Sequence, residues 1–258
     1  MGVLNVTPDS FSGDGLQVDP GRALERAQQL RAEGAAIIDV GGESTRPGAS
    51  PVGTAEELRR VLPIVAALCR DPAIVVSVDT SNPEVMRAVA GAGAAMINDV
   101  RALQRAGALA AVAATGLAAC LMHMQGEPAT MQQAPHYDDV CAEVGAWLAA
   151  RVAAAVAAGI PRERLCIDPG FGFGKTQAHN LRLLDGLHGM AALGLPVLVG
   201  LSRKSLAGAL TGRAPADRLA GSVTLATVAM LRGAHIIRAH DVAATVDAAR
   251  IVSAMRSL

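Results

Sequence analysis

Carboxylate and amide side chains follow several short apolar runs in this chain. Asp79, Asn98 and Asp168 each stand at the end of such a run, and Asp99 directly follows Asn98. Carboxylate and amide oxygens accept hydrogen bonds from paired N–H donors. Gathered in one cavity, these groups suit a flat heterocycle with several N–H groups and a carbonyl. The alternative for any one of them is a buried carboxylate that holds the backbone of a loop.

Basic side chains follow two later apolar runs. Lys204 lies in the segment 202–205, and Arg238 and His240 stand on either side of Ala239. Arginine and histidine form charge-assisted hydrogen bonds with phosphate oxygens, so this pair indicates an anion site. Lys204 alone would also suit a Schiff-base aldolase, but the neighbouring acidic, amide and basic groups favour a heterocycle and a phosphate.

Two polar loops rich in turn-forming residues could cover such a site. The first, 7–15, contains Phe11, and the second, 41–49, reads GGESTRPGA. Long polar loops of this kind often close over bound substrate. The alternative is a pair of ordinary surface loops.

The segment 170–176, GFGFGKT, resembles a nucleotide-binding P-loop at its Gly-Lys-Thr end. The motif requires a glycine five residues before Gly174, and this chain has Pro169 there, so the pattern fails. We expect a tight loop beside the pocket.

His123 has no second histidine at the spacing of a metal site. A hydrogen-bonded histidine in the core is therefore favoured over a catalytic one. Its neighbour Met122 could form a soft apolar wall against a flat ligand.

Eight short apolar runs alternate with stretches of helical periodicity. The runs lack the polar alternation of half-exposed strands, which predicts parallel strands buried on both faces. The predicted strands are 2–6, 36–40, 74–78, 94–97, 118–122, 165–167, 196–201 and 234–237. Apolar residues at three- and four-residue spacing predict helices that include 22–33, 54–69, 83–90 and 142–158.

This order of elements predicts one domain over residues 1–258, an α/β (β/α)8 TIM barrel with its active site at the C-terminal ends of the strands. A doubly wound open sheet is the alternative, but the turn at 5–9 lacks the Gly-x-Gly-x-x-Gly pattern. In a barrel, all strand ends meet at one mouth, and the loops after strands seven and eight commonly bind phosphate. The polar and basic groups would therefore share one site.

Composition argues against two other classes of function. Lys plus Arg and Asp plus Glu each number 23, and aromatic residues make up 2% of the chain. A neutral chain has no long-range attraction to nucleic acid or to a membrane surface, and so few rings cannot form a base-stacking platform. We therefore expect neither nucleic acid nor a membrane as a partner; the strand-end groups described above point to small-molecule substrates.

The mean hydropathy of +0.34 makes a membrane span worth testing. The longest weakly polar run, 107–122, has about sixteen residues and contains Gly116, whereas a bilayer span needs about twenty residues. The first residues do not resemble a signal peptide, and the four cysteines form no Cys-x-x-Cys pair. We expect a cytoplasmic protein with reduced thiols and no membrane span.

Long motifs in a fixed order carry a family resemblance across the whole chain. Residues 1–12 read MGVLNVTPDSFS, and residues 39–48 read DVGGESTRPG. These resemble the two signatures of the dihydropteroate synthase family. The other matching segments follow in the same order: 77–80, 97–99, 121–126, 168–175, 200–204 and 238–242.

The resemblance implies condensation of 6-hydroxymethyl-7,8-dihydropterin diphosphate with p-aminobenzoate, giving 7,8-dihydropteroate and diphosphate in folate biosynthesis. It also implies a homodimer through outer helices and a target for sulfonamides, which mimic p-aminobenzoate. The residues that would hold the pterin are Asp79, Asn98, Asp168 and Lys204. Arg238 and His240 would hold diphosphate, and Asn5 would meet a Mg²⁺ that also touches it.

The resemblance places further residues around the substrates. The second-loop residue Thr45 would contact substrate, with Arg46 beside it. The p-aminobenzoate pocket would be formed by Phe11, Pro47 and Ser205. The remaining substrate-binding residues would be Met122, Phe173 and Gly200, and Asp79, Lys204 and Asn5 are the expected catalytic set.

The implied reaction is an alkyl transfer in which an arylamine attacks the pterin methylene and diphosphate leaves. Mg²⁺ and cationic side chains would stabilise charge on the leaving group. Asp79 could stabilise positive charge on the pterin, and no covalent enzyme nucleophile is needed. Closure of both loops would exclude water from the activated methylene.

Two alternatives of other classes stay open. A pterin-binding methyltransferase that serves a corrinoid protein would share the pterin pocket but would not need Lys204, Arg238 and His240 as a diphosphate site. A non-catalytic paralogue would bind pterin without turning it over.

Overall fold

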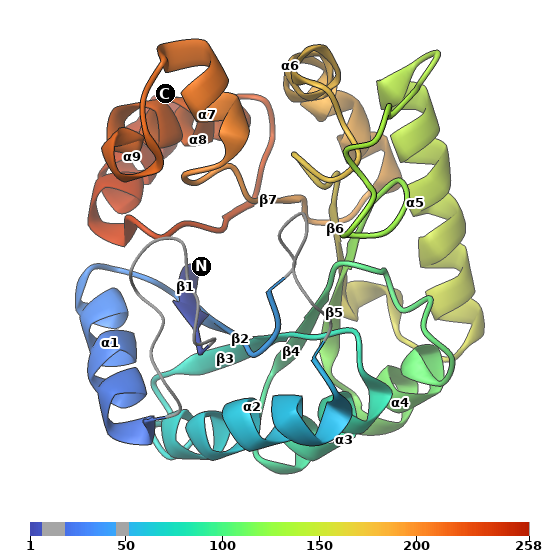
Figure 1. The fold of residues 1–258 in the computed structure, drawn as a ribbon, viewed down its shortest axis with the longest axis vertical. Helices are drawn as coiled ribbons and strands as arrows, with labels where there is room; N and C mark the ends of the chain where they lie inside the picture. The colour runs from blue at the N-terminus through green and yellow to red at the C-terminus, as the bar shows by residue number, and fades with distance from the viewer. Residues whose placement is uncertain (7–18, 45–51, 258) are drawn as a thin grey trace.

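The computed structural model describes residues 1–6, 19–44 and 52–257, which form a ring of strands surrounded by helices (Figure 1). The strands are β1 (Gly2–Asn5), β2 (Ile37–Gly41), β3 (Val75–Asp79), β4 (Met96–Asp99), β5 (Ala118–Met122), β6 (Leu165–Asp168), β7 (Leu198–Val199) and β8 (Ile236–Ile237). The longer helices between and after them are α1 (Pro20–Ala32), α2 (Thr54–Leu68), α3 (Pro83–Gly91), α4 (Ala108–Thr115), α5 (Val140–Ala157), α6 (Gln177–Asp185), α7 (Ser205–Thr211), α8 (Leu219–Leu231) and α9 (Val242–Arg256).

Parallel pairing joins the strands into a closed barrel. Strands β1 to β6 form one sheet in sequence order, and β7 pairs with β8. Two isolated bridges join these sheets, Ile167 with Val197 beside β7 and Gly2 with Ala239 just after β8. The predicted single (β/α)8 barrel is confirmed in its fold.

The strand side chains alternate between the helices and the barrel interior. On β2, Ile38 and Val40 belong to the large apolar core, whereas Asp39 lies inside the barrel and is bonded to residues of β4 and the segment after β8. A second, smaller apolar cluster fills the lower interior and contains Met96, Cys120, Cys166 and Leu198. Two residues further along the same strands come Asn98, Met122, Asp168 and Gly200. The polar site therefore lies one layer above an apolar floor.

Polar side chains begin several helices where the sequence supplies them. Asp19 accepts hydrogen bonds from two backbone N–H groups at the start of α1. Asn82 and Asp139 cap α3 and α5 in the same way. Such capping oxygens satisfy N–H groups that have no partner within the helix. The caps fix where each strand-to-helix loop ends.

The predicted strand boundaries hold to within about two residues, except at the last two strands. The prediction 118–122 matches β5, whereas the predicted 196–201 and 234–237 shrink to two residues each. Pro196 has no N–H to donate to a ladder, and Val197 pairs only through an isolated bridge. Both strands exist as predicted, but the regular hydrogen-bonded part of each is shorter than its apolar run.

One outer helix is apolar enough to cross a membrane by length and composition. This is α5, with a mean hydropathy of 1.6 over 18 residues. It packs against β5 and α6 and buries Val144, Leu148 and Val152, so its composition fits a helix on the outside of the barrel. The run 107–122, taken as the longest apolar candidate from sequence, divides into α4 and β5. The four cysteines are free thiols.

Candidate functional site

The ends of neighbouring strands bring the predicted polar residues together. Asn5 pairs in register with Gly41, Gly41 with Asp79, and Asp79 with Asn98. On the other side of the barrel mouth, Met122 pairs with Asp168. Because these residues share the C-terminal edge of one closed sheet, their side chains surround a single space.

An ion-pair network occupies one side of the mouth. Arg238 donates from Nε to Asp39 Oδ2 at 2.6 Å and from Nη2 to Asp79 Oδ2 at 3.1 Å. Asn98 donates from Nδ2 to the same Asp39 oxygen at 3.1 Å. Four strand segments are thus linked through one guanidinium and two carboxylates.

This network sets the protonation of its members. Burial raises the pKa of the Asp79 carboxyl to about 7, although Arg238 opposes the rise, and the charge of Asp39 adds to it. Desolvation works to lower the pKa of Arg238, but the charges of Asp39 and Asp79 outweigh it and raise that pKa overall. The guanidinium is therefore a fixed cation, whereas Asp79 titrates near neutral pH.

On the opposite side of the mouth, Asp168 and Lys204 influence each other through their charges. Asp168 is buried and accepts from the Gly170 backbone N–H at 2.7 Å. Burial raises its pKa, while Lys204 and that N–H act to lower it. Lys204 donates to the Phe171 carbonyl oxygen at 2.6 Å and lies 4.6 Å from the centroid of the Phe173 ring. Burial lowers the pKa of Lys204 to about 8, and Asp168 opposes that fall.

The segments after β7 and β8 carry the predicted anion site. His240 contacts Ser202 Oγ through both its backbone N–H and its ring Nδ1, each at 3.1 Å. Gly200 lies between Lys204 and Arg238. A Cβ added at this glycine would stand 3.9 Å from Lys204 Nζ and 3.9 Å from Arg238 Cβ. Glycine keeps this gap free of a side chain. The exposed Ser205 begins α7 directly after Lys204.

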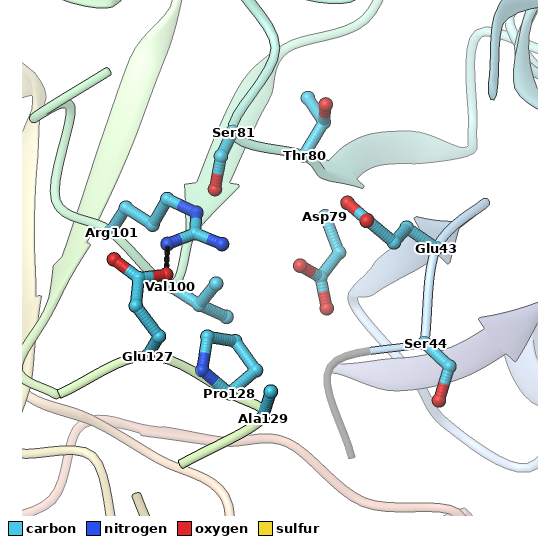
Figure 2. A pocket seen from close by; sticks show the side chains of 10 residues that line it. All are labelled: Glu43, Ser44, Asp79, Thr80, Ser81, Val100, Arg101, Glu127, Pro128 and Ala129. Carbon is cyan, nitrogen blue, oxygen red and sulfur yellow. Dashed lines mark hydrogen bonds and ion pairs between the residues drawn. The ribbon is translucent and has the colours of Figure 1, made fainter. Parts of the chain in front are cut away.

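A cavity of about 230 Å³ opens beside Asp79 (Figure 2). Asp79 and Glu43 face it from β3 and the end of β2, and an ion pair between Arg101 and Glu127 faces them from the other side. The cavity is lined by Glu43, Ser44, Asp79, Thr80, Ser81, Val100, Arg101, Glu127, Pro128 and Ala129. It covers the Asp79 side of the mouth, while Lys204 and Phe173 pack together on the other side.

The segment that resembles a P-loop is a tight turn, as predicted. An added Cβ at Gly170 would overlap the His123 carbonyl oxygen, and this glycine has a φ of +70°. Lys175 is buried inside the turn and donates to the carbonyl oxygens of Gly170 and Phe173, each at 3.0 Å. The glycines therefore allow close packing of backbone, and the lysine holds the turn from within.

His123 is a buried histidine with a hydrogen bond, which confirms the sequence interpretation. Its Nδ1 lies 2.9 Å from Lys175 Nζ, and its ring meets Trp147 edge-on at 4.9 Å between centroids. Burial lowers the pKa of His123 to about 3, and the Lys175 charge adds to that fall. A neutral imidazole can accept from the ammonium through Nδ1.

One sequence expectation is wrong. Asp99 does not share the cavity with Asn98, because its carboxylate accepts from the Ser81 hydroxyl and from the backbone N–H groups of Arg101 and Leu103. It is a loop-holding carboxylate, the alternative that the sequence left open. The predicted site residues Phe11, Thr45, Arg46 and Pro47 lie outside the described residues.

Sequence reasoning missed Asp39 and Lys175 as parts of the site. Asp39 stands within a run predicted to be buried on both faces, and an acid in such a run is a usable signal because buried charges need partners. Lys175 gave no comparable signal beyond the P-loop resemblance that failed. Asp39 meets Arg238, and Lys175 meets His123, across long separations in the sequence.

Comparisons with known proteins agree on one family. Residues 1–240 match the model of the family described as pterin binding enzyme. The dihydropteroate synthase of Escherichia coli (strain K12) is 53% identical over 257 residues, which cover 100% of this chain and 91% of that protein.

Two solved structures are similar over the whole chain. A Yersinia pestis dihydropteroate synthase with a sulfonamide drug complex has a TM-score of 0.98 and 51% identity, covering 100% of this chain and 94% of that one. A Xanthomonas albilineans dihydropteroate synthase with 4-aminobenzoic acid has a TM-score of 0.93 and 52% identity, covering 100% and 93%.

Proposed function

The chain belongs to the pterin-binding enzyme family, among its dihydropteroate synthases, and we propose that its strand-end groups divide the work of that reaction between a pterin end and a diphosphate end. The enzyme is a transferase that condenses 6-hydroxymethyl-7,8-dihydropterin diphosphate with p-aminobenzoate. The observation that carries the residue roles is that acids and an amide from β3, β4 and β6 meet cations from the segments after β7 and β8 at one mouth.

The pterin end consists of Asp79, Asn98, Asp168 and Lys204. Carboxylate and amide oxygens accept from the N–H groups of a pterin, and an ammonium donates to its carbonyl. Asp168 keeps an oxygen for this purpose because only its Oδ1 is bonded to Gly170. Met122 and Phe173 would supply apolar walls, and Gly200 would leave room for the ring.

The diphosphate end consists of Arg238 and His240. Two nitrogens of Arg238 already donate to Asp39 and Asp79, which leaves further N–H groups of the guanidinium to meet phosphate oxygens. Holding the arginine on carboxylates fixes the direction in which those groups point. His240 would add a second donor from the same segment.

Asn5 offers an oxygen that suits Mg²⁺. A Cβ added at Gly41 would lie 3.6 Å from this oxygen and 3.9 Å from Asp79 Oδ2, so the glycine leaves the space between the two oxygens without a side chain of its own. The described residues contain no group of three or more His, Cys, Asp or Glu able to hold a metal, and Mg²⁺ commonly takes few protein ligands with substrate phosphates and water. When bound, the ion would stabilise negative charge on the leaving diphosphate.

Transfer of the methylene requires separation of charge, which the site is arranged to stabilise. As the C–O bond to diphosphate breaks, positive charge grows on the pterin and negative charge on the leaving group. Asp79 would stabilise the positive charge on the pterin, and Arg238 and His240 would stabilise the negative charge on the leaving diphosphate. The p-aminobenzoate nitrogen attacks the methylene and then loses a proton, so no covalent enzyme intermediate is needed.

The p-aminobenzoate pocket would be formed by Phe11, Pro47 and Ser205, with Thr45 and Arg46 in contact with substrate. An aromatic wall at Phe11 would contribute about 0.5–1.5 kcal/mol, and Pro47 would limit the freedom that its loop loses on closure. We expect sulfonamides to compete here. Phe11→Leu and Pro47→Ser should raise KM for p-aminobenzoate and leave KM for the pterin diphosphate unchanged. An effect confined to the pterin KM would refute this assignment.

The decisive test is release of diphosphate by the purified protein. Release should require pterin diphosphate, p-aminobenzoate and Mg²⁺ together, and dihydropteroate should form in equal amount. A pterin-binding paralogue without activity would bind the pterin and release nothing. A methyltransferase would bind tetrahydrofolate derivatives and show no affinity for diphosphate.

We also propose a cytoplasmic homodimer. Large apolar side chains are exposed on neighbouring helices, with Leu231 on α8 and Ile251 and Met255 on α9. The exposed fractions of 50%, 62% and 57% are high for apolar residues, and exposed apolar patches often mark subunit contacts. Sedimentation should give twice the chain mass, and Ile251→Glu should shift the protein toward monomer.

A further inference from the structure

The carboxylate of Asp39 holds two residues that would contact different parts of one substrate. Its Oδ2 accepts from Arg238 Nε at 2.6 Å and from Asn98 Nδ2 at 3.1 Å. Arg238 belongs to the diphosphate end and Asn98 to the pterin end. Asp39 itself has no exposed surface, so it can act on substrate only through these neighbours.

The surroundings of Asp39 are not those of a group kept for stability. Its other oxygen, Oδ1, has no hydrogen-bond partner among the described residues, and the same holds for the hydroxyl of Ser77, its register partner on β3. A buried charge with an unsatisfied oxygen is costly, and well-packed apolar residues often replace buried ion pairs without loss of stability. The arrangement is better explained by the orientation that it imposes on Arg238 and Asn98.

Asp39 also explains why Arg238 can hold one direction. A guanidinium bonded only to Asp79 could turn about that single contact. With Nε on Asp39 and Nη2 on Asp79, two contacts from adjacent strands fix its plane. Orientation of a binding group before substrate arrives lowers the entropy lost in reaching the reactive geometry.

We propose that Asp39 is a positioning residue that orients Arg238 toward the diphosphate and Asn98 toward the pterin of the same substrate. This inference rests on the proposed residue roles. It predicts that loss of the Asp39 carboxylate damages handling of pterin diphosphate and leaves handling of p-aminobenzoate intact.

Asp39→Asn is the test variant because asparagine has the shape of aspartate. In this variant the Arg238 guanidinium faces only one carboxylate, that of Asp79. The amide oxygen can stand where Oδ2 stands and accept from both Arg238 and Asn98, but without the carboxylate charge both bonds become weaker, so the two side chains are held less firmly. We expect kcat/KM for pterin diphosphate to fall about 100-fold, the scale of a small misplacement of binding groups. KM for p-aminobenzoate should stay within about twofold of the wild-type value, since neither Arg238 nor Asn98, the two residues that Asp39 is bonded to, is assigned to that pocket.

Ser77→Ala is the matched control, because Ser77 is equally buried, lies beside Asp39 and has no hydrogen-bond partner among the described residues. It should leave both KM values unchanged. In an Arg238→Ala background, Asp39→Asn should lower kcat/KM for pterin diphosphate by a clearly smaller factor than in the wild type. The reason is that the effect of Asp39 through Arg238 is already lost in that background. An equal fall in kcat/KM in the two backgrounds would show that Asp39 does not act through Arg238, and would overturn that part of the inference.

The outcomes separate this inference from the proposed function. A wild-type protein that releases no diphosphate with both substrates present refutes the function. An active wild type together with an Asp39→Asn variant whose KM and kcat are unchanged overturns the inference. A variant with a lower melting temperature and unchanged kinetics would make Asp39 purely structural, and also overturns it. If Asp39→Asn does not fold, Asp39→Ser is measured by the same KM comparison.

Discussion

Asp168→Asn should weaken pterin binding far more than p-aminobenzoate binding. The wild-type carboxylate bonds the Gly170 N–H through Oδ1 at 2.7 Å and keeps Oδ2 for substrate. In the variant, the amide oxygen can retain the bond to Gly170. The NH₂ group then replaces Oδ2 and faces the N–H donors of the pterin.

The expected loss follows from one charged hydrogen bond. Hydrogen bonds to charged groups contribute roughly 1.5–3 kcal/mol, which is a loss of roughly 10- to 150-fold in affinity at about 1.4 kcal/mol per factor of ten. A second effect acts through Lys204, since the Asp168 charge opposes the fall of its pKa. Without that charge, less of Lys204 is protonated at neutral pH, which adds to the loss.

Calorimetric titration with a pterin analogue is the direct assay, with the two KM values as the kinetic check. Asp185→Asn is the matched control, because Asp185 is the last residue of the outer helix α6 and forms an exposed ion pair with Arg232. It should change neither affinity. Unchanged pterin affinity in a folded Asp168→Asn variant would refute the assignment and leave Asp168 as a residue that holds the 170–174 turn.

Three further predictions rest on the same geometry. Activity should rise with pH through about 7 as Asp79 ionises and fall above about 8 as Lys204 loses its proton; an unchanged acidic limb in Asp79→Asn would contradict this. His240→Ala should weaken binding of diphosphate with Mg²⁺ about tenfold, as calorimetry can measure, at a typical cost of ~1.5 kcal/mol for a charged hydrogen bond. Gly170→Ala should lower thermal stability far more than Gly172→Ala, because a Cβ at Gly170 overlaps backbone, whereas at Gly172 it meets only a lysine methylene at 3.5 Å.

The strand-end residues could be predicted from sequence because of how barrels are built. A short apolar run that ends in a polar group is a local pattern, and Asp79, Asn98 and Asp168 each show it. Parallel strands in a closed sheet place all such ends at one mouth. The local sequence pattern and the barrel topology therefore both predict that these three residues lie at one mouth. The register pairs in the structure agree, with Asp79 beside Asn98 and Asp168 beside Met122.

The supporting residues could not be predicted in this way, because their roles depend on contacts between distant segments. Asp39 meets Arg238 across 199 positions of sequence, and His123 meets Lys175 across 52. Asp99 is the opposite case, a residue that the sequence placed in the site and the structure does not. It follows a buried strand directly after Asn98, but its side chain points away from the cavity and holds a loop. Successive residues on a strand point to opposite faces, so of two neighbouring polar residues only one can reach the interior.

The charges of the site suggest why diphosphate would need Mg²⁺. Among the described residues, the carboxylates of Asp39, Asp79 and Asp168 lie at or beneath the mouth with the cationic groups of Lys175, Lys204 and Arg238. In their charged forms they balance, so these groups alone carry no surplus positive charge to meet a multiply charged anion. Arg238 is moreover shared with two acids. Binding of diphosphate would therefore gain from the positive charge of the metal proposed at Asn5.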